Sequence, residues 1–135
     1  MRFVSYAQEF EDLIIYVVMK DYVTNGNYID VGANDPLYFS VTKAFYDMGW
    51  NGINIEPLDD KCELLVRERP RDVNLCIGVG EKEGELKMAV AGMASSFATD
   101  VQSKMNLAEE RYITKKITTL QRIIAVSYTH LTLPT

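Results

Sequence analysis

The sequence predicts an α/β protein built on a parallel sheet, and two observations carry this prediction. The stretch from Asn27 to Pro36 has the character of a buried strand that runs into a glycine turn and then a helix start. Between residues 27 and 79, strand-like and helix-like segments alternate, which favours parallel strands with right-handed crossovers. Such sheets bind ligands at the carboxyl ends of their strands, so we expect a ligand near Gly32. One glycine is also what an ordinary strand-to-helix turn needs, so this stretch alone leaves ligand binding open.

Composition places the chain among single-domain globular proteins. It has 135 residues, of which 47% are hydrophobic and 24% charged. The formal net charge of -5 and the scattered basic residues disfavour nucleic acid or an anionic membrane surface as the main partner. A small-molecule substrate is the partner that we expect.

Location is inferred from what the chain lacks. Polar and acidic residues follow Met1–Val4 at once, which is not typical of a signal peptide, and no apolar run approaches the ~18 residues of a membrane span. Cys62 and Cys76 form neither a Cys-x-x-Cys pair nor a disulfide pattern. We therefore expect free, buried cysteines in a cytoplasmic protein.

The first half of the chain predicts three helices and two strands. Ser5 to Gln8 matches a capping box, so the first helix should start there and end near a turn at residues 24–26. The first strand is Tyr28–Val31, after which Asn34 or Asp35 can cap a second helix that stops at Gly49. Gly52–Glu56 is the second strand, and a third helix capped by Asp59 or Asp60 should end before Pro70. The apolar stripes of the three helices are, in order, Phe10, Leu13, Ile14 and Val17; Leu37, Val41, Ala44, Phe45 and Met48; and Leu58, Cys62, Leu65 and Val66.

Beyond the third helix the alternation ends. Val73–Val79 is the third strand, and Glu85–Val90 alternates like a strand that forms a hairpin with it. Met93–Ala108 is poorly periodic and suggests a loop, whereas Tyr112–Leu120 can form a further strand. A helix should open at Leu120 and fail to continue, because Val126–Thr135 fits no element of an α/β domain.

Elimination narrows the chemistry. The chain has one histidine, His130, so a Ser-His-Asp triad in the body of the chain and a histidine metal site lack their residues, and we expect no metal. Neither a P-loop nor the Gly-x-Gly-x-x-Gly of dinucleotide binding is present. What remains is a ligand with a ribose but no phosphate chain, contacted at Gly32 and at Glu56, whose carboxylate could accept from both ribose hydroxyls. Glu56 could also be an ordinary solvated acid at a strand end.

Several separated motifs, in order, resemble one family over about Ser5 to Ile124. It is the family of FkbM-type S-adenosylmethionine-dependent methyltransferases. The motifs are Ser5–Gln8 with Glu11–Asp12, Tyr28–Pro36, Gly49–Trp50 leading to Gly52–Pro57, Arg69–Asp72, and Ser95–Phe97.

The resemblance implies a class I methyltransferase (Rossmann-like) fold, here its N-terminal half, with parallel strands in the order 3-2-1 and an added hairpin or strand. It implies S-adenosyl-L-methionine as cofactor and methyl transfer to the hydroxyl oxygen of a hydroxylated metabolite or sugar. No catalytic residue can be assigned. The residues implied to bind the cofactor are Asp30, Gly32, Ala33 and Asn34 at the methionine part, Glu56 at the ribose, Ile77 and Gly78 near the adenine, and Tyr6 and Gln8 at the carboxylate end.

One departure from the family concerns the C-terminus. In the family a fourth strand follows the segment like Thr118–Ile124, so we expect residues 1–125 to be a partial domain and residues 126–135 a non-native or disordered tail. Such a fragment should bind cofactor weakly, transfer no methyl group and self-associate through its bare sheet edge. A cofactor-binding module without catalysis and an inactive structural fragment stay open as alternatives.

Overall fold

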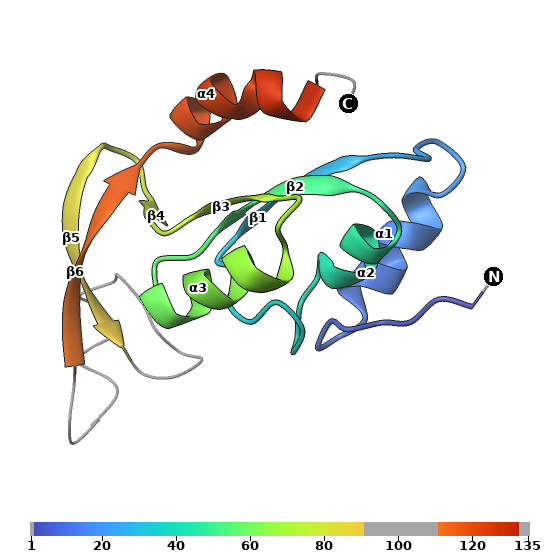
Figure 1. Cartoon of the computed structure of the whole chain (residues 1–135), viewed down its shortest axis with the longest axis horizontal. Helices are drawn as coiled ribbons and strands as arrows, with labels where there is room; N and C mark the ends of the chain where they lie inside the picture. Colours follow the sequence, from blue (N-terminus) through green and yellow to red (C-terminus); the bar gives the residue numbers. More distant parts are fainter. Residues whose placement is uncertain (1, 91–110, 133–135) are drawn as a thin grey trace.

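The computed structural model describes residues 2–90 and 111–132, which form two small sheets with helices around them (Figure 1). The first sheet contains β1 (Asn27–Val31), β2 (Asn51–Ile55) and β3 (Val73–Leu75). All three strands are parallel, in the order β1-β2-β3. The three-strand order expected from the sequence is therefore confirmed.

Helices cover both faces of this sheet. Below it in Figure 1 lie α1 (Glu11–Met19), α2 (Lys43–Asp47) and α3 (Asp59–Glu68), and above it lies α4 (Leu120–Thr132). Parallel sheets need such cover on both faces, because neither face can be left to water. None of the helices within the described ranges is long and apolar enough to cross a membrane.

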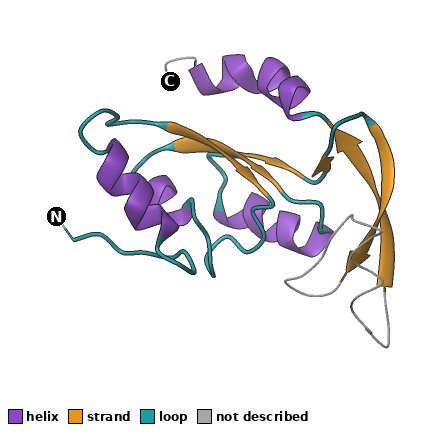
Figure 2. Ribbon diagram, turned by 180° about the vertical axis from the view of Figure 1, so that it is seen from behind, coloured by secondary structure: helices purple, strands orange, loops and turns teal. Residues whose placement is uncertain are grey.

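The second sheet corrects the expected hairpin. It contains β4 (Gly78–Val79), β5 (Gly84–Val90) and β6 (Arg111–Thr118) in the order β4-β6-β5. This sheet lies beyond the carboxyl end of β3 (Figure 2). β5 pairs antiparallel with β6 along its whole length, not with the strand before it. The expected strand at residues 73–79 breaks at Cys76, so that its last two residues join β6 instead of β2. The loop expected at residues 93–108 and the motif at residues 95–97 lie outside the described residues.

The two faces of the first sheet differ in chemistry. Ile53 and Ile55 of β2 form a core cluster with Ile123 of α4, so the face toward α4 is apolar. The alternate positions carry polar side chains, among them Asp30 and Asn54, which meet other polar groups beneath the sheet. The sequence predicted apolar helix stripes against this second face, but a hydrogen-bonded network occupies much of it.

The N-terminal helix begins later than the capping box predicted. The carboxylate of Asp12, which is fully buried, accepts hydrogen bonds from the Ser5 hydroxyl (2.5 Å) and from the backbone N–H groups of Tyr6 (2.8 Å) and Leu13 (2.8 Å). Ser5 is therefore engaged by Asp12 and does not cap a helix with Gln8. As a result, α1 starts only at Glu11.

The helix expected after the glycine turn is also much shorter. Asp35 accepts from the N–H groups of Leu37 and Tyr38, both at 2.9 Å, which folds the chain into a local turn instead of a helix start. Phe39 then takes a left-handed conformation, with φ of 57°. Regular helix begins only at Lys43, so no helix N-terminus lies at the glycine turn.

Three further expectations need correction. The residue that caps α3 is Leu58, not an aspartate, and Asp59 and Asp60 occupy the first turn, where negative charge favours the helix dipole. The C-terminal helix does continue, through Thr132, although whether residues 126–135 are native stays a prediction. Cys62 and Cys76 are not free but form a disulfide, which the spacing of two isolated cysteines could not indicate.

Candidate functional site

The register of the parallel strands builds the candidate site. Val31 pairs with Ile55, so the residues that follow, Gly32 and Glu56, emerge side by side at the carboxyl edge of the sheet. The N–H groups of Gly32 and Ala33 both donate to the Ile55 carbonyl oxygen, at 2.8 and 3.1 Å. The turn after β1 is therefore folded over the end of β2.

Glycine is required in this turn by backbone conformation. Gly32 has a φ of +74°, where a side chain is strained, and Asn34 shares the left-handed region with a φ of 55°. A Cβ built on Gly32 would meet no atom within 4 Å. Open space therefore lies beside the backbone at the edge where open α/β sheets bind ligands.

Glu56 joins the two turns at this edge. Its side chain is buried, with only 4% of the residue exposed. One carboxylate oxygen accepts from the Asn34 N–H at 2.7 Å, and the other accepts from the Leu58 N–H at 2.9 Å. Because a carboxylate can accept about four hydrogen bonds, each oxygen keeps one acceptor site as far as the described residues are concerned.

The same contacts argue against a phosphate ligand. A phosphate cradle needs successive backbone N–H groups that point at the anion. The N–H groups of Gly32, Ala33 and Asn34 are instead all used by the end of β2. This geometry agrees with the exclusion of pyrophosphate binding from the missing glycine-rich motifs.

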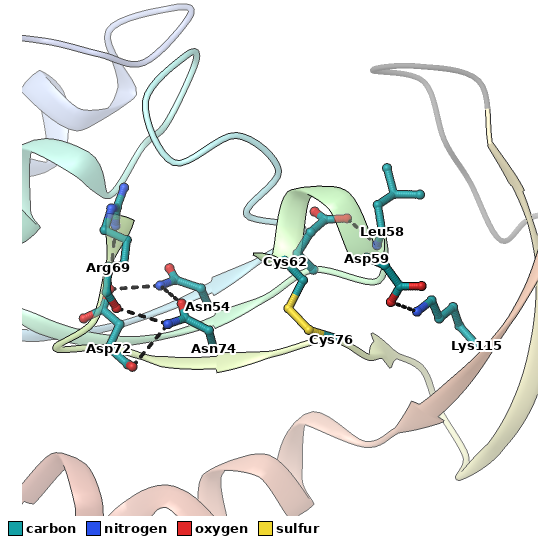
Figure 3. The surroundings of a disulfide bond; sticks show 10 residues. Asn54, Leu58, Asp59, Cys62, Arg69, Asp72, Asn74, Cys76 and Lys115 are labelled. Carbon is teal, nitrogen blue, oxygen red and sulfur yellow. Dashed lines mark hydrogen bonds and ion pairs between the residues drawn. A yellow bond between two sulfur atoms is a disulfide. The ribbon is translucent and has the colours of Figure 1, made fainter. Parts of the chain in front are cut away.

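A cleft of about 460 Å³ opens next to the turn. It lies between Asn34, the first turns of α3 and the β5–β6 hairpin. Lys115 of β6 forms an ion pair with Asp59 of α3 and so connects the hairpin to the helix (Figure 3). The lining residues are Asn34, Leu58, Asp59, Asp60, Lys61, Glu63, Val90, Arg111 and Ile113.

An ion pair joins the turn after β1 to α3 beside the cleft. Lys61 of α3 reaches Asp35 at 3.3 Å. Burial alone would raise the pKa of Asp35, but the N–H groups of Tyr38 and Leu37 and the Lys61 ammonium outweigh it and leave that pKa lowered. Asp35 is therefore a charged anchor between the turn and α3.

Asp30 lies beneath the sheet, not at its edge. Its carboxylate accepts from the Thr42 hydroxyl at 2.7 Å. Burial raises the pKa of Asp30, although the Thr42 hydrogen bond and the nearby Arg69 charge lower it in part. Burial and the hydrogen bond to Asp72 likewise raise the pKa of Tyr28 well above its ordinary value.

Arg69 is the centre of this buried network. Arg69 is only 1% exposed, and its guanidinium donates to the Pro36 carbonyl and the Ser40 hydroxyl, each at 2.9 Å. It also faces the Asp72 carboxylate at 3.7 Å. Asp72 in turn accepts from the Gly52 N–H at 2.8 Å. It also accepts from the Asn54 amide at 2.9 Å (Figure 3). Arg69 thus holds the loop after Gly32 against the strands.

The other predicted site residues lie in separate settings. Tyr6 belongs to the segment that Asp12 organises, and Gln8 is exposed. Ile77 lines a different cavity of about 620 Å³ beneath α4, and Gly78 starts β4. The structure therefore groups Gly32, Ala33, Asn34 and Glu56 at one edge.

Sequence reasoning named the segment Arg69–Asp72 only as a family motif and gave it no role. An arginine and an aspartate three positions apart after a helix were the available signal, but their burial was not predictable from spacing. Within the described residues, no three His, Cys, Asp or Glu side chains gather as a metal site.

Comparison with known proteins decides the family. The family model described as the methyltransferase FkbM domain matches residues 30–131, three quarters of the chain. The chain belongs to this family. No curated protein and no solved structure matches it. Membership confirms the resemblance found in the sequence, and it makes the edge at Gly32 and Glu56 the candidate site of an FkbM methyltransferase domain, which uses a methyl donor.

Proposed function

We propose that the chain is the cofactor-binding part of an S-adenosylmethionine-dependent methyltransferase that methylates a hydroxyl oxygen of a small metabolite or sugar. One observation carries the proposal beyond family membership. The turn at Gly32 has open space beside its backbone, and it lies next to a buried acid at the carboxyl edge of a parallel sheet.

The residues at this edge fit a nucleoside ligand without phosphates. Among the described residues, each oxygen of Glu56 has one hydrogen-bond donor and one acceptor site to spare, which suits the two hydroxyls of a ribose. The occupied N–H groups of Gly32 and Ala33 offer nothing to a pyrophosphate. The cleft beside Asn34 and Leu58 provides a wall against which an adenine could lie.

When bound, S-adenosylmethionine would supply a sulfonium methyl group that is already reactive toward an oxygen nucleophile. The protein would then contribute orientation more than covalent chemistry. Gly32 would let the ligand approach the backbone, and the hydrogen bonds of Glu56 would keep the two turns in place. We assign no described side chain as the base that receives the hydroxyl proton.

Calorimetric titration tests the proposal. We expect S-adenosylmethionine and S-adenosylhomocysteine to bind, and NAD not to bind. Glu56→Gln should weaken binding by about 1.5 to 3 kcal/mol, the range for hydrogen bonds to a charged group. Glu68→Gln is the matched control, because Glu68 is exposed and pairs only with its neighbour Arg67 among the described residues.

Two results would contradict the proposal. Binding of NAD with no binding of either sulfur nucleoside would reject the cofactor. Equal affinities for the Glu56→Gln and Glu68→Gln variants would reject the role of Glu56 while leaving the family assignment intact.

A further inference from the structure

The disulfide between Cys62 and Cys76 joins α3 to the end of β3 (Figure 3). Cys62 is fully buried on α3, whereas Cys76 is exposed just beyond the strand. Their Cα atoms lie 5.5 Å apart, and the bond closes a loop between positions 14 apart in sequence. The bond therefore spans a helix and a strand that both flank the candidate site.

Each cysteine is linked to Glu56 through one intervening residue. On one side, the Cys62 N–H donates to the Leu58 carbonyl at 2.8 Å, and the Leu58 N–H donates to the Glu56 carboxylate at 2.9 Å. On the other side, the Glu56 N–H donates to the carbonyl of Leu75, the residue before Cys76, at 3.0 Å. The disulfide closes a ring of contacts around the acid at the site.

Besides the disulfide, ion pairs hold the first turns of α3, among them the pair of Lys61 with Asp35 in the turn after β1. Leu65, on the second half of the helix, is buried, but Val66 is 54% exposed. The ion pair between Asp59 and Lys115 holds the N-terminus, yet the Asp59 side chain is 71% exposed, where ion pairs contribute little. Leu58 follows Glu56 by two residues, so their contact is local, and the disulfide fixes how the start of α3, which carries Leu58, lies against the end of β3.

We propose that Cys62 and Cys76 form a reversible thiol–disulfide site that sets the affinity of this edge for its nucleoside ligand. The oxidised form holds Leu58 and Glu56 in place, and the reduced form loosens α3. This inference rests on the proposed function for its ligand, but its effect on α3 is independent of any ligand.

The exchange needs only a small thiol of the glutathione class. A first thiolate attacks the sulfur of the exposed Cys76, forms a mixed disulfide there and releases the Cys62 sulfur as a thiolate, which takes a proton. A second thiol attacks the mixed disulfide, releases Cys76 as a thiol and leaves as the small-molecule disulfide. Two small thiols are oxidised and the protein disulfide is reduced to two thiols. A buried thiol at Cys62 packs as a small apolar group, so the reduced chain keeps its fold.

The test compares the oxidised and reduced full chain. We expect dithiothreitol to speed backbone hydrogen exchange in α3 and to weaken S-adenosylhomocysteine binding, measured by calorimetry, by about fivefold or more, the low end of ordinary coupling between two sites. Oxidised glutathione should restore both properties. Because the chain has two cysteines in all, the Cys62→Ala/Cys76→Ala variant should match the reduced chain and ignore the reductant.

The possible failures are distinguishable. Equal affinity and equal exchange in the two redox states would overturn the inference while the proposed function stands. A bond that glutathione mixtures neither reduce nor re-form would overturn reversibility. No nucleoside binding in either state would reject the proposed function. Hydrogen exchange in α3 would then be the test of the disulfide's role. Unchanged rates would overturn that role, and faster rates on reduction would support it.

Discussion

At the scale of single residues, substitutions of two glycines with similar backbone conformations can distinguish the effect of backbone strain from the effect of ligand contact. Gly32 has a φ of +74° and Gly49 a φ of +93°, and a Cβ on either would meet no atom within 4 Å. Gly32 lies at the candidate site, whereas Gly49 precedes β2 at the opposite end of the sheet. The pair therefore offers a control that is matched in conformation and differs in location.

We expect Gly32→Ala and Gly49→Ala each to lower the free energy of unfolding by about 1 to 2 kcal/mol, because a left-handed conformation is strained for alanine. Only Gly32→Ala should also abolish the rise in melting temperature caused by S-adenosylhomocysteine. Thermal melts with and without this ligand measure both effects. Equal ligand-induced shifts in the two variants would show that nothing binds against Gly32.

Asp30 should make stability depend on pH, because burial raises the pKa of its carboxyl. Below the ordinary pKa of aspartate, the group is protonated in both the folded and the unfolded chain and has no effect. As the pH rises toward the raised pKa, the unfolded chain ionises first, so the folded state loses stability. Above the raised pKa the loss is complete.

Asp30→Asn should remove this loss. The free energy of unfolding of the variant, compared with that of the natural chain, should rise as the pH passes from the ordinary pKa of aspartate upward. Urea unfolding between about pH 3 and pH 8 measures this difference, and the exposed Asp60→Asn serves as its control. A difference that shrinks with rising pH would contradict the expected sign.

At the scale of elements, Arg69 links the loop after Gly32 to the strands. Its contacts with Pro36, Ser40 and Asp72 are buried, so removal of its charge takes a donor from the first two and the neighbouring positive charge from the Asp72 carboxylate. Arg67, two positions earlier, forms only an exposed ion pair with Glu68 within the described part of the chain.

We expect Arg69→Met to lower the free energy of unfolding by about 3 to 5 kcal/mol, the usual cost of breaking a buried ion pair. Arg67→Met should change it by about 0.5 kcal/mol or less. Urea unfolding of both variants provides the comparison. Similar losses in the two variants would mean that the network beneath the sheet adds little to stability.

The elements show why part of the fold could be predicted from the sequence. β1, β2 and α3 are short segments with strong periodicity, so local pattern was enough to place them. The first and second helices start late because Asp12 and Asp35 use their carboxylates on nearby N–H groups, and such local competition is visible only in three dimensions. The pairing of β5 with β6 and of Cys62 with Cys76 joins distant segments, which no local pattern encodes.

The candidate site divides in the same way. Gly32 and Glu56 could be predicted together, because parallel strands in register bring their carboxyl ends to one edge. The role of Glu56 as acceptor for Asn34 and Leu58 could not be predicted, because it depends on how the two turns fold.

At the scale of the whole molecule, the first sheet has two edge strands, β1 and β3, each of which pairs on one side only among the described residues. β1 lies at the end of the order β1-β2-β3, and Val31 at its end is 53% exposed. Nearby, α1 and the residue that precedes it also expose large apolar side chains. These are Phe10, Leu13, Ile14, Ile15, Val17 and Val18.

We expect this edge to make the chain self-associate, because an unpaired apolar strand edge recruits another strand. A lysine at the edge should prevent pairing, so Val31→Lys should shift the chain toward monomer in sedimentation velocity. Val66→Lys is the control, since Val66 is equally exposed, at 54%, but lies on α3. A natural chain that sediments as a monomer at high concentration would contradict the prediction. Loss of association in the Val66→Lys variant, with none in Val31→Lys, would move the interface from the sheet edge to α3.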